Sequence, residues 1–431
     1  MTDVSDVSNF VNELQSLMKP SEQDSTVVSS KKIKVLIVST HINQVNGYSK
    51  VVYNIIKQLV SNGINVVHFA TQKLVNADLS RRYPESVKVI EAVEKEPGFG
   101  LTELPVVIQK EKPDVVFIYN DLSVICAYIE NIRKIESRTF KIWAYIDMVY
   151  TFAPQLMIDM MNRDVDRIFC FTKGWKDSLK SQGITRPLDV MSHGIDSSIH
   201  AIPRDVARQS LGLPKDVFLI TSVNKNIPRK RLDLLVIAFV RLIVAFPLKQ
   251  IFCLIIGDKG ERGGYQLFDI FAREIKRNGG SVDVFGNRLL ITEGNKCYSD
   301  SDINVIYNCG DVGVSCAEGE GFGLCTFEQM SLGIPQIVPE INGYNEYCTN
   351  ENSIMIKPRL RYYIPQVHHS VTGEAQMVDP EDVKKALERY VFDESEKSLH
   401  GRLGKEVCAG YTWEKCVAIM VRRLKELDDD L

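Results

Sequence analysis

Short apolar runs alternate with helical patterns over the first half of the chain. The runs cover residues 33–40, 64–71, 87–93, 114–120, 141–148 and 167–172. Continuous apolar runs of this length are typical of parallel strands that are buried on both faces, with helices packed between them. The pattern predicts a doubly wound sheet, and the ligands of such sheets bind at the carboxyl ends of the strands.

A second series of the same kind begins near Pro203. Its apolar runs cover residues 217–224, 251–258, 287–292, 312–316, 335–341 and 353–358. No short-period repeat relates the two series, so they are alike in architecture rather than in sequence. We therefore expect an α/β fold with two Rossmann-like, doubly wound domains, residues 33–200 and 201–408, that face each other across a cleft.

Three segments stand apart from this alternation. Residues 1–32 are polar and rich in serine, and we expect an N-terminal extension that is partly flexible. Residues 359–380 are longer and more irregular than an ordinary connection. The C-terminal segment, 409–431, has a helical pattern in which Trp413 is expected to be a packing anchor rather than a ligand.

Composition narrows the class of protein. The chain has 431 residues with 45% hydrophobic and 25% charged residues and a net charge of −3, which is typical of a soluble protein without a nucleic acid partner. The ten cysteines are scattered singly, which favours reduced thiols and a cytoplasmic location. We expect neither a signal peptide nor a transmembrane helix, and peripheral contact with a membrane stays open.

The stretch 317–335 joins a strand, a glycine turn and a helix. The run 312–316 leads into the turn 320–323, and a helical pattern follows. This arrangement presents backbone N–H groups and a positive helix end to a phosphate. Glu320 and Glu328 bracket the turn, and each could accept hydrogen bonds from sugar hydroxyls. The alternative is a pair of ordinary helix carboxylates, one near the helix dipole and one solvated.

This stretch resembles the E-x7-E signature of retaining glycosyltransferases of family four. Cys325 stands where the family often has proline. The resemblance implies a GT-B fold and a C-terminal helix, residues 409–431, that crosses back onto the first domain. The residues that carry it are Glu320, Gly321, Phe322, Gly323, Leu324, Glu328, Gly333 and Pro335.

A basic loop follows the run 217–224. Lys225, Arg229, Lys230 and Arg231 lie where a strand meets a helix, a place suited to a diphosphate. In the resemblance, Lys225 stands where arginine is usual, and Lys230 matches the family's lysine. Alone the loop could simply be solvated, but together with the glutamate turn it favours phosphate binding.

The resemblance also implies how the donor is held. Glu328 would bind the ribose, Lys225 and Lys230 the diphosphate, and Glu320 the sugar. Gly321 and the backbone of Phe322, Gly323 and Leu324 would complete the sugar site. Attack on the front face of the sugar, assisted by the leaving phosphate, is the mechanism that the resemblance implies, and no cofactor is expected.

The first domain offers two further candidates. Gly47 starts the helix after the first strand, where the family brings its backbone close to the donor or the acceptor, although a simple turn explains it nearly as well. Asp147 lies at the carboxyl end of a strand. It could orient the acceptor or take its proton as a catalytic residue beside Glu320 and Lys230, or it could cap the next segment. His193 is expected to be a hydrogen-bonded structural histidine.

No metal site is expected. The first domain lacks an Asp-x-Asp pair at a strand end, and Asp300-Ser301-Asp302 precedes a helix as a cap would. His368 and His369 are adjacent in a polar loop without a third ligand.

These observations lead to a retaining glycosyltransferase that uses a UDP- or GDP-linked sugar. Its acceptor would be a hydroxyl group of a glycan, a lipid-linked sugar or a protein. Two alternatives stay open. One is another GT-B enzyme, such as a sugar-nucleotide epimerase or a glycoside phosphorylase, and the other is an inactive family member that binds or scaffolds.

Overall fold

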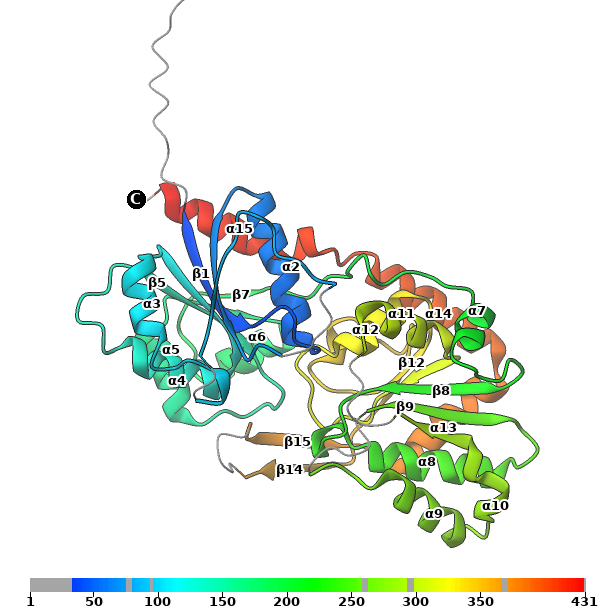
Figure 1. Ribbon diagram of the computed structural model, residues 1–431. Coiled ribbons are helices and arrows are strands. Elements are labelled where there is room, and N and C mark those ends of the chain that lie inside the picture. The colour runs from blue at the N-terminus through cyan, green and yellow to red at the C-terminus, as the bar shows by residue number, and fades with distance from the viewer. Residues whose placement is uncertain are drawn as a thin grey trace, which may run out of the picture. The chain divides into compact units, whose positions relative to one another are not determined.

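The computed structural model describes residues 33–74, 80–93, 96–257, 263–292, 298–365 and 371–429. The expected N-terminal extension, residues 1–32, and the pair His368 and His369 lie outside the described residues. Two parallel sheets, each with its own helices, make up the described chain (Figure 1). This confirms the prediction of an α/β fold with two Rossmann-like domains.

The first sheet has seven parallel strands in the order β3-β2-β1-β4-β5-β6-β7. Six strands fall on the six predicted apolar runs. The apolar pattern did not indicate β7, which is only three residues long. The strands are β1 (Lys34–Thr40), β2 (Asn65–Thr71), β3 (Lys88–Glu91), β4 (Val115–Asp121), β5 (Lys141–Asp147), β6 (Arg167–Cys170) and β7 (Leu188–Val190).

Helices connect these strands, and the first of them shows why they form. Asn46 caps it, since its side chain accepts a hydrogen bond from the N–H of Ser49 at 2.9 Å. Its buried positions, from Val51 to Leu59, recur at helical spacing and cover the sheet. The helices are α2 (Gly47–Ser61), α3 (Leu104–Glu111), α4 (Leu122–Ile132), α5 (Gln155–Asp164) and α6 (Lys173–Ser181).

The second sheet has six parallel strands in the order β10-β9-β8-β11-β12-β13. They are β8 (Phe218–Val223), β9 (Ile251–Ile256), β10 (Leu289–Ile291), β11 (Val312–Val314), β12 (Gln336–Pro339) and β13 (Ile354–Ile356). The helices of this domain are α7 (Arg204–Ser210), α8 (Leu232–Ala245), α9 (Leu267–Arg277), α10 (Val282–Phe285), α11 (Asp300–Cys309), α12 (Leu324–Ser331), α13 (Pro380–Phe392) and α14 (Glu394–Cys408). No helix among the described residues is long and apolar enough to cross a membrane.

The segment expected to be irregular contains an antiparallel hairpin. It is formed by β14 (Leu360–Ile364) and β15 (Gly373–Met377), which pair Tyr362 with Ala375. Charged and polar residues interrupt both strands, so the apolar pattern gave no signal for them. Ala375 and Tyr362 instead pack with Val149 and Tyr150 of the first domain.

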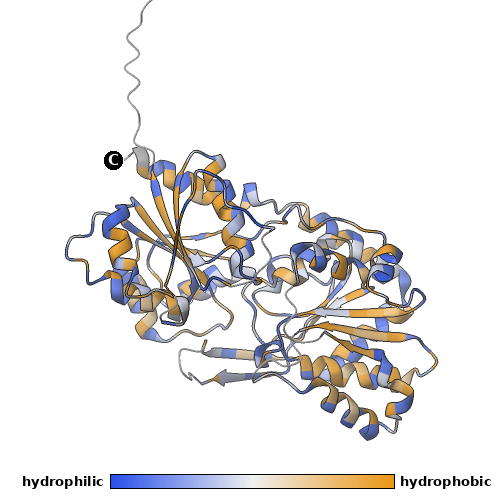
Figure 2. Ribbon diagram, viewed as in Figure 1, coloured by the Kyte–Doolittle hydropathy of each residue, from blue (hydrophilic) through white to orange (hydrophobic). Residues whose placement is uncertain are grey.

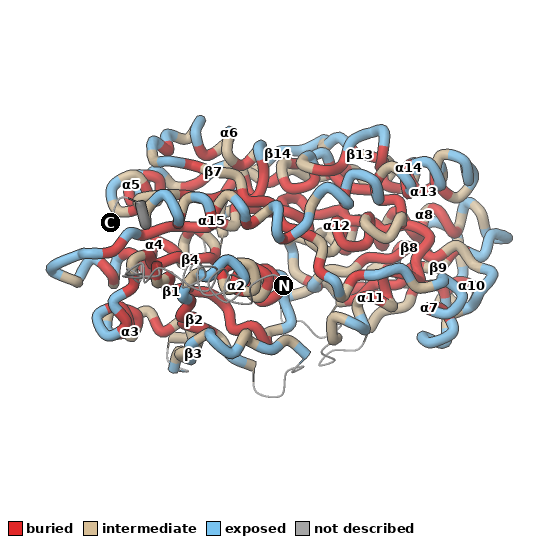
Figure 3. The backbone as a smooth tube through the Cα atoms, turned by 90° about the horizontal axis from the view of Figure 1, so that it is seen from above, coloured by how far each residue is buried: buried red, intermediate tan, exposed pale blue. Residues whose placement is uncertain are grey.

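The apolar core continues from the first domain into the second. Phe322 and Phe327 belong to the same buried cluster as Phe171 and Trp175. Apolar residues concentrate in the strands of both sheets (Figure 2), and the strands are the most deeply buried parts of the chain (Figure 3). The two domains therefore share packed surface rather than only a linker.

The end of the chain returns to the first domain. The last helix, α15 (Trp413–Asp429), packs against α2, and Nε of Arg423 lies 3.2 Å from Oδ2 of Asp189. Where this passage begins, the N–H of Ile195 donates to the carbonyl of Tyr411 at 3.0 Å. The two connections between the domains thus lie against each other.

Candidate active site

The glycine turn lies between β11 and α12, and two tyrosines fix its shape. Gly323 has a φ of +83°, and a Cβ there would lie 2.4 Å from the ring of Tyr344, so only glycine fits. The hydroxyl of Tyr347 lies 3.0 Å from the carbonyl of Phe322 and 2.9 Å from that of Gly323. The turn is therefore a rigid platform at the carboxyl end of a strand.

Glu320 of this turn is buried against the basic loop. Its Oε2 pairs with Nζ of Lys230 and lies 3.5 Å from Nη1 of Arg229, which also donates to the carbonyl of Gly319 at 2.6 Å. Burial alone would raise the pKa of Glu320, but the charges of Lys230 and Arg229 outweigh burial and lower this pKa. Glu320 is thus a fixed carboxylate between two cations.

Two carboxyl groups of the first domain meet at one tyrosine. The hydroxyl of Tyr48, on α2, lies 2.9 Å from Oδ1 of Asp121 and 2.8 Å from Oδ2 of Asp147. A hydroxyl has one proton, so both contacts are hydrogen bonds only when one carboxyl group is protonated. Burial and the charge of Asp121 raise the pKa of Asp147 to about 7, and burial also raises the pKa of Asp121. Burial therefore favours the protonated form of each of these two carboxyl groups.

Asp147 and the glycine turn come together across the two domains. A Cβ on Gly321 would lie 2.0 Å from Oδ1 of Asp147, so the absence of a side chain is what admits the carboxylate. This oxygen is buried and has no hydrogen-bond partner. The positive charge of Arg229 acts on both Asp147 and Glu320. The structure thus joins Asp147, Gly321 and Glu320 in one site.

Glu328, on α12, is held by one residue of each domain. Nζ of Lys50 lies 2.5 Å from its Oε1, and the hydroxyl of Tyr307 donates to its Oε2 at 3.0 Å. Lys50 also lies 3.6 Å from Asp300, and Asp300 pairs with Arg81 at 2.7 Å. Two cations of the first domain therefore bind two carboxylates of the second.

This network corrects one detail of the sequence interpretation. Asp302 does form a capping box with Ser299 at the start of α11, as a cap was expected to do. Asp300, by contrast, does not act as the cap. It turns toward Arg81, because a first-turn side chain of α11 can reach the first domain in this arrangement.

The other expected site residues lie less centrally. Lys225 is exposed just after β8. Gly47 is the first residue of α2, and a Cβ there would lie 3.9 Å from Cδ2 of Leu324. That is an ordinary contact distance, so Gly47 approaches the start of α12 without glycine being required by space. The ring of Phe322 is buried in the core, which leaves only its backbone to face a ligand.

His193 is buried as expected but is not hydrogen bonded. Neither ring nitrogen has a partner, and its ring packs on Phe171, Phe322 and Trp413. Burial lowers the pKa of His193 to about 3, so the ring is neutral. The expected hydrogen-bonded role is therefore wrong, because an aromatic cage has replaced polar partners.

The site is closed in this structure. The cavity beside Asp147 has a volume of about 30 Å³, and the one beside Glu320 about 10 Å³. A cavity needs roughly 10–15 Å³ to hold one water molecule, so neither cavity has room for a sugar. Within the described part of the chain, no group of three or more His, Cys, Asp or Glu side chains is placed to hold a metal ion.

Sequence reasoning missed three residues of this site. Tyr48 and Lys50 carry no local signal, since their partners are distant in the sequence. Asp121 did carry one, because it lies at the carboxyl end of β4 just as Asp147 lies at that of β5.

Comparison with known proteins bears on the fold and on the second domain. Residues 214–362 match the family described as glycosyl transferases group 1. No curated protein sequence matches the chain.

Solved structures are similar over nearly the whole chain. Sucrose-phosphate synthase from Thermosynechococcus elongatus has a TM-score of 0.73 and 15% identity, covering 93% of this chain and 100% of that one. A glycosyltransferase from Rickettsia africae has a TM-score of 0.67 and 15% identity, with 93% and 98% covered. Anabaena HepE in complex with UDP-glucose has a TM-score of 0.65 and 15% identity, with 93% and 100% covered. The chain therefore has the GT-B fold, and its second domain matches the glycosyl transferases group 1 family over residues 214–362.

Proposed function

We propose that this protein is a retaining glycosyltransferase that moves a sugar from a nucleotide diphosphate to a hydroxyl acceptor in the cytoplasm. The observation that carries the proposal is the buried contact of Glu320 with Lys230 and Arg229, opposite Asp147 of the other domain. The described cysteines are free thiols, which suits a reducing compartment.

The charges of this cluster suit a diphosphate leaving group. Lys230 and Arg229 supply two positive charges against the single charge of Glu320. A departing nucleotide diphosphate gains negative charge as the bond to the sugar breaks, and fixed cations in a site without bulk water stabilise that charge strongly. We propose that Lys230 is the main contact, with Lys225 at the outer end of the diphosphate. Metal-independent turnover follows if these cations suffice.

In this proposal the sugar lies at the glycine turn, and the ribose lies at the helix α12 that follows it. Glu320, Gly321 and the backbone from Phe322 to Leu324 hold the sugar, and Glu328 accepts hydrogen bonds from the ribose. Glu328 is bound to Lys50 in the closed structure. The ribose can reach it only after that ion pair separates.

Asp147 receives the acceptor in this proposal. Its buried Oδ1 lacks a hydrogen-bond partner and lies against Gly321, beside the proposed sugar site. An acceptor hydroxyl that donates to this oxygen would be held next to the sugar. With a pKa of about 7, Asp147 can orient the hydroxyl while the leaving phosphate takes its proton.

The donor is tested by calorimetry with UDP, GDP and their sugars. HepE, one of the similar structures, was solved with UDP-glucose, so UDP-glucose is the first donor to try. The anomeric configuration of the product, read by NMR, tests retention, and turnover in chelator tests the absence of a metal requirement. Nucleotide binding without hydrolysis or transfer would favour an inactive binding protein, and conversion of the free sugar nucleotide would favour an epimerase.

A further inference from the structure

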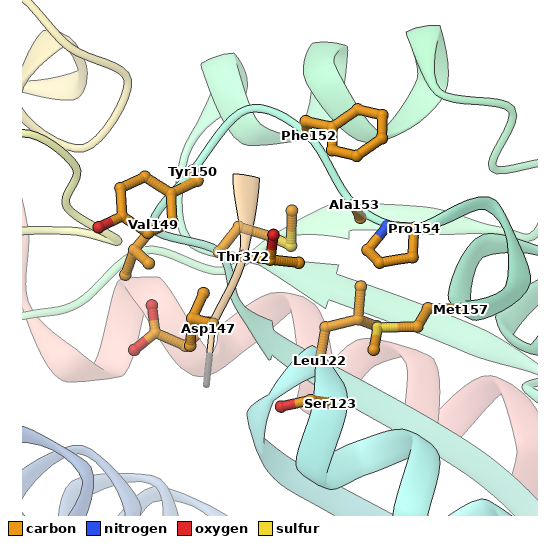
Figure 4. Close-up of a pocket in the computed structure, with 12 residues that line it drawn as sticks. Leu122, Ser123, Asp147, Val149, Tyr150, Phe152, Ala153, Pro154, Met157 and Thr372 are labelled. Carbon is orange, nitrogen blue, oxygen red and sulfur yellow. The ribbon is translucent and has the colours of Figure 1, made fainter. Parts of the chain in front are cut away.

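A pocket next to Asp147 contains none of the residues to which we assign the donor. It is lined by the end of β5, the loop that leads into α5, the start of α4 and two residues before β15. Figure 4 shows the carboxylate of Asp147 at one end of this pocket and Leu122, Pro154 and Met157 at the other.

The lining of this pocket is apolar apart from a few groups. Leu122, Val149, Phe152, Pro154 and Met157 supply most of it. The hydroxyl of Tyr150 is already committed, since it donates to Oε1 of Glu318 at 3.2 Å. The hydroxyl of Thr372 likewise donates a hydrogen bond to the carbonyl of Ile364 at 2.6 Å.

Two polar atoms at the pocket lack partners. Oδ1 of Asp147 and Oγ of Ser123 are buried without any hydrogen bond. A buried polar atom without a hydrogen-bond partner is destabilising, so such an atom marks a place where a ligand can contribute. A single hydroxyl group would satisfy Asp147, whereas a long glycan would bring many more hydroxyls than this lining can bind.

Exposed apolar side chains lie at the rim of the pocket, next to its apolar lining. Phe152 is 48% exposed, and its ring contacts that of Tyr363, which is 67% exposed, edge to face at 6.0 Å. Leu156, in the first turn of α5, is 73% exposed. Exposed apolar side chains that lie together beside a pocket are typical of a binding surface, whereas single ones are ordinary.

We propose that this pocket binds the acceptor, and that the acceptor carries an apolar group beside its reacting hydroxyl. The proposal rests on the proposed transfer reaction and narrows its acceptor from any glycan to a glycoside with an alkyl or aromatic aglycone. The hydroxyl donates to Asp147, and the aglycone packs on Met157 and Phe152. The enclosed part of this pocket is about 30 Å³ in the closed structure, so the acceptor enters only when the two domains separate, as the ribose does.

Calorimetry with matched glycosides tests this inference. Methyl, octyl and phenyl glycosides of glucose, galactose and mannose are titrated into the whole protein, with octyl glycosides kept below their micelle concentration. We expect an octyl or a phenyl glycoside to bind at least about tenfold more tightly than its methyl partner, because each buried CH₂ contributes. A preference for octyl would indicate a lipid-like chain, and a preference for phenyl an aromatic aglycone.

Two variants test whether the preference for an apolar aglycone arises in this pocket. Phe152→Ser and Met157→Gln should remove most of the preference for the apolar aglycone. Phe392→Ser is the matched control, since Phe392 is 51% exposed at the end of α13, with its ring against Phe246 at 4.8 Å and Nζ of Lys249 at 5.3 Å. Melting temperatures of the variants confirm that each is folded.

Three results would overturn the inference. These are equal affinity for the methyl and the apolar glycosides, a preference that survives both variants, and no binding of any glycoside. Titration of the same samples with UDP and GDP keeps the two proposals apart. Nucleotide binding without an aglycone preference would reject the acceptor class and leave the proposed transferase standing, whereas an aglycone preference without nucleotide binding would reject the transferase.

Discussion

Nζ of Lys50 lies 2.5 Å from Oε1 of Glu328, so a lysine of the first domain occupies the carboxylate that we assign to the ribose. The side chains are 7% and 3% exposed, and the pair is therefore screened little by solvent or salt. The closed structure and the ribose-bound state compete for the same two oxygens. The proposed function therefore couples donor binding to separation of this ion pair.

Replacing Lys50 tests that competition. Lys50→Met should tighten binding of bare nucleotide diphosphate, because the contact to Glu328 no longer has to be broken. A hydrogen bond to a charged group contributes roughly 1.5–3 kcal/mol, so calorimetry should show about a tenfold to hundredfold gain in affinity. Lys57→Met is the control, since Lys57 lies on the same helix and pairs with Asp196 at 3.4 Å. Weaker binding in Lys50→Met alone would mean that Lys50 itself holds the donor.

Glu320 and Glu328 should bind different parts of the donor, Glu320 the sugar and Glu328 the ribose. Glu328→Gln should weaken bare nucleotide by about tenfold to hundredfold, since the ribose contact is the same in the ground and transition states. Glu320→Gln should leave nucleotide binding intact or slightly tighter, because it frees Lys230 and Arg229 for the phosphates. Transfer should nevertheless fall in Glu320→Gln. Equal loss of bare nucleotide affinity in both variants would refute this division.

Lys230 of the basic loop should contribute more to catalysis than Lys225 does. Lys230 contacts buried Glu320, whereas Lys225 is exposed. Lys230→Ala should therefore raise the barrier by roughly 2.7–4 kcal/mol through kcat, as loss of a donor to developing charge does. Lys225→Ala should change kcat much less. Steady-state kinetics on both variants decides the matter, and a raised KM with normal kcat in Lys230→Ala would make this lysine a binding residue only.

Asp147 should make stability depend on pH. Its pKa of about 7 lies above the value of about 3.9 in an unfolded chain, so the folded state holds the proton more tightly. Its contribution to stability is complete below about pH 4 and is lost as pH rises through 7. Chemical denaturation of Asp147→Asn from pH 4 to 8 should show a flatter decline, by at most about 1.4 kcal/mol per pH unit.

An exposed aspartate provides the control for this titration. Asp205→Asn, on α7, changes the same charge without burial and should keep the wild-type slope. If Asp147→Asn also keeps that slope, the proton does not reside on Asp147, and Asp121 becomes the group to replace.

The fold could be predicted because its strands appear as apolar runs in the local sequence. Buried parallel strands need apolar residues at every position, and twelve such runs became strands of the two sheets. The glycine turn could also be recognised in the sequence. Neighbouring atoms leave no room for a Cβ at Gly321 or Gly323, so both positions must be glycine. Strands with mixed polarity, such as β14 and β15, left no comparable pattern.

The partners within the site could not be predicted in the same way. Lys50 and Glu328 are 278 positions apart, and only the packing of two domains brings them together. Asp300 looked like a helix cap because local capping and distant ion pairing use the same side chain. Asp121 and Asp147 are linked through the hydroxyl of Tyr48, whose role emerges only from its position between them.

The bond between Ile195 and Tyr411 has a mechanical consequence. The polypeptide passes between its domains once on the way out and once on the way back, and this bond fastens the two passages side by side. A motion that separated Lys50 from Glu328 while this bond persisted would turn the two domains about these two passages instead of pulling them apart along their whole contact.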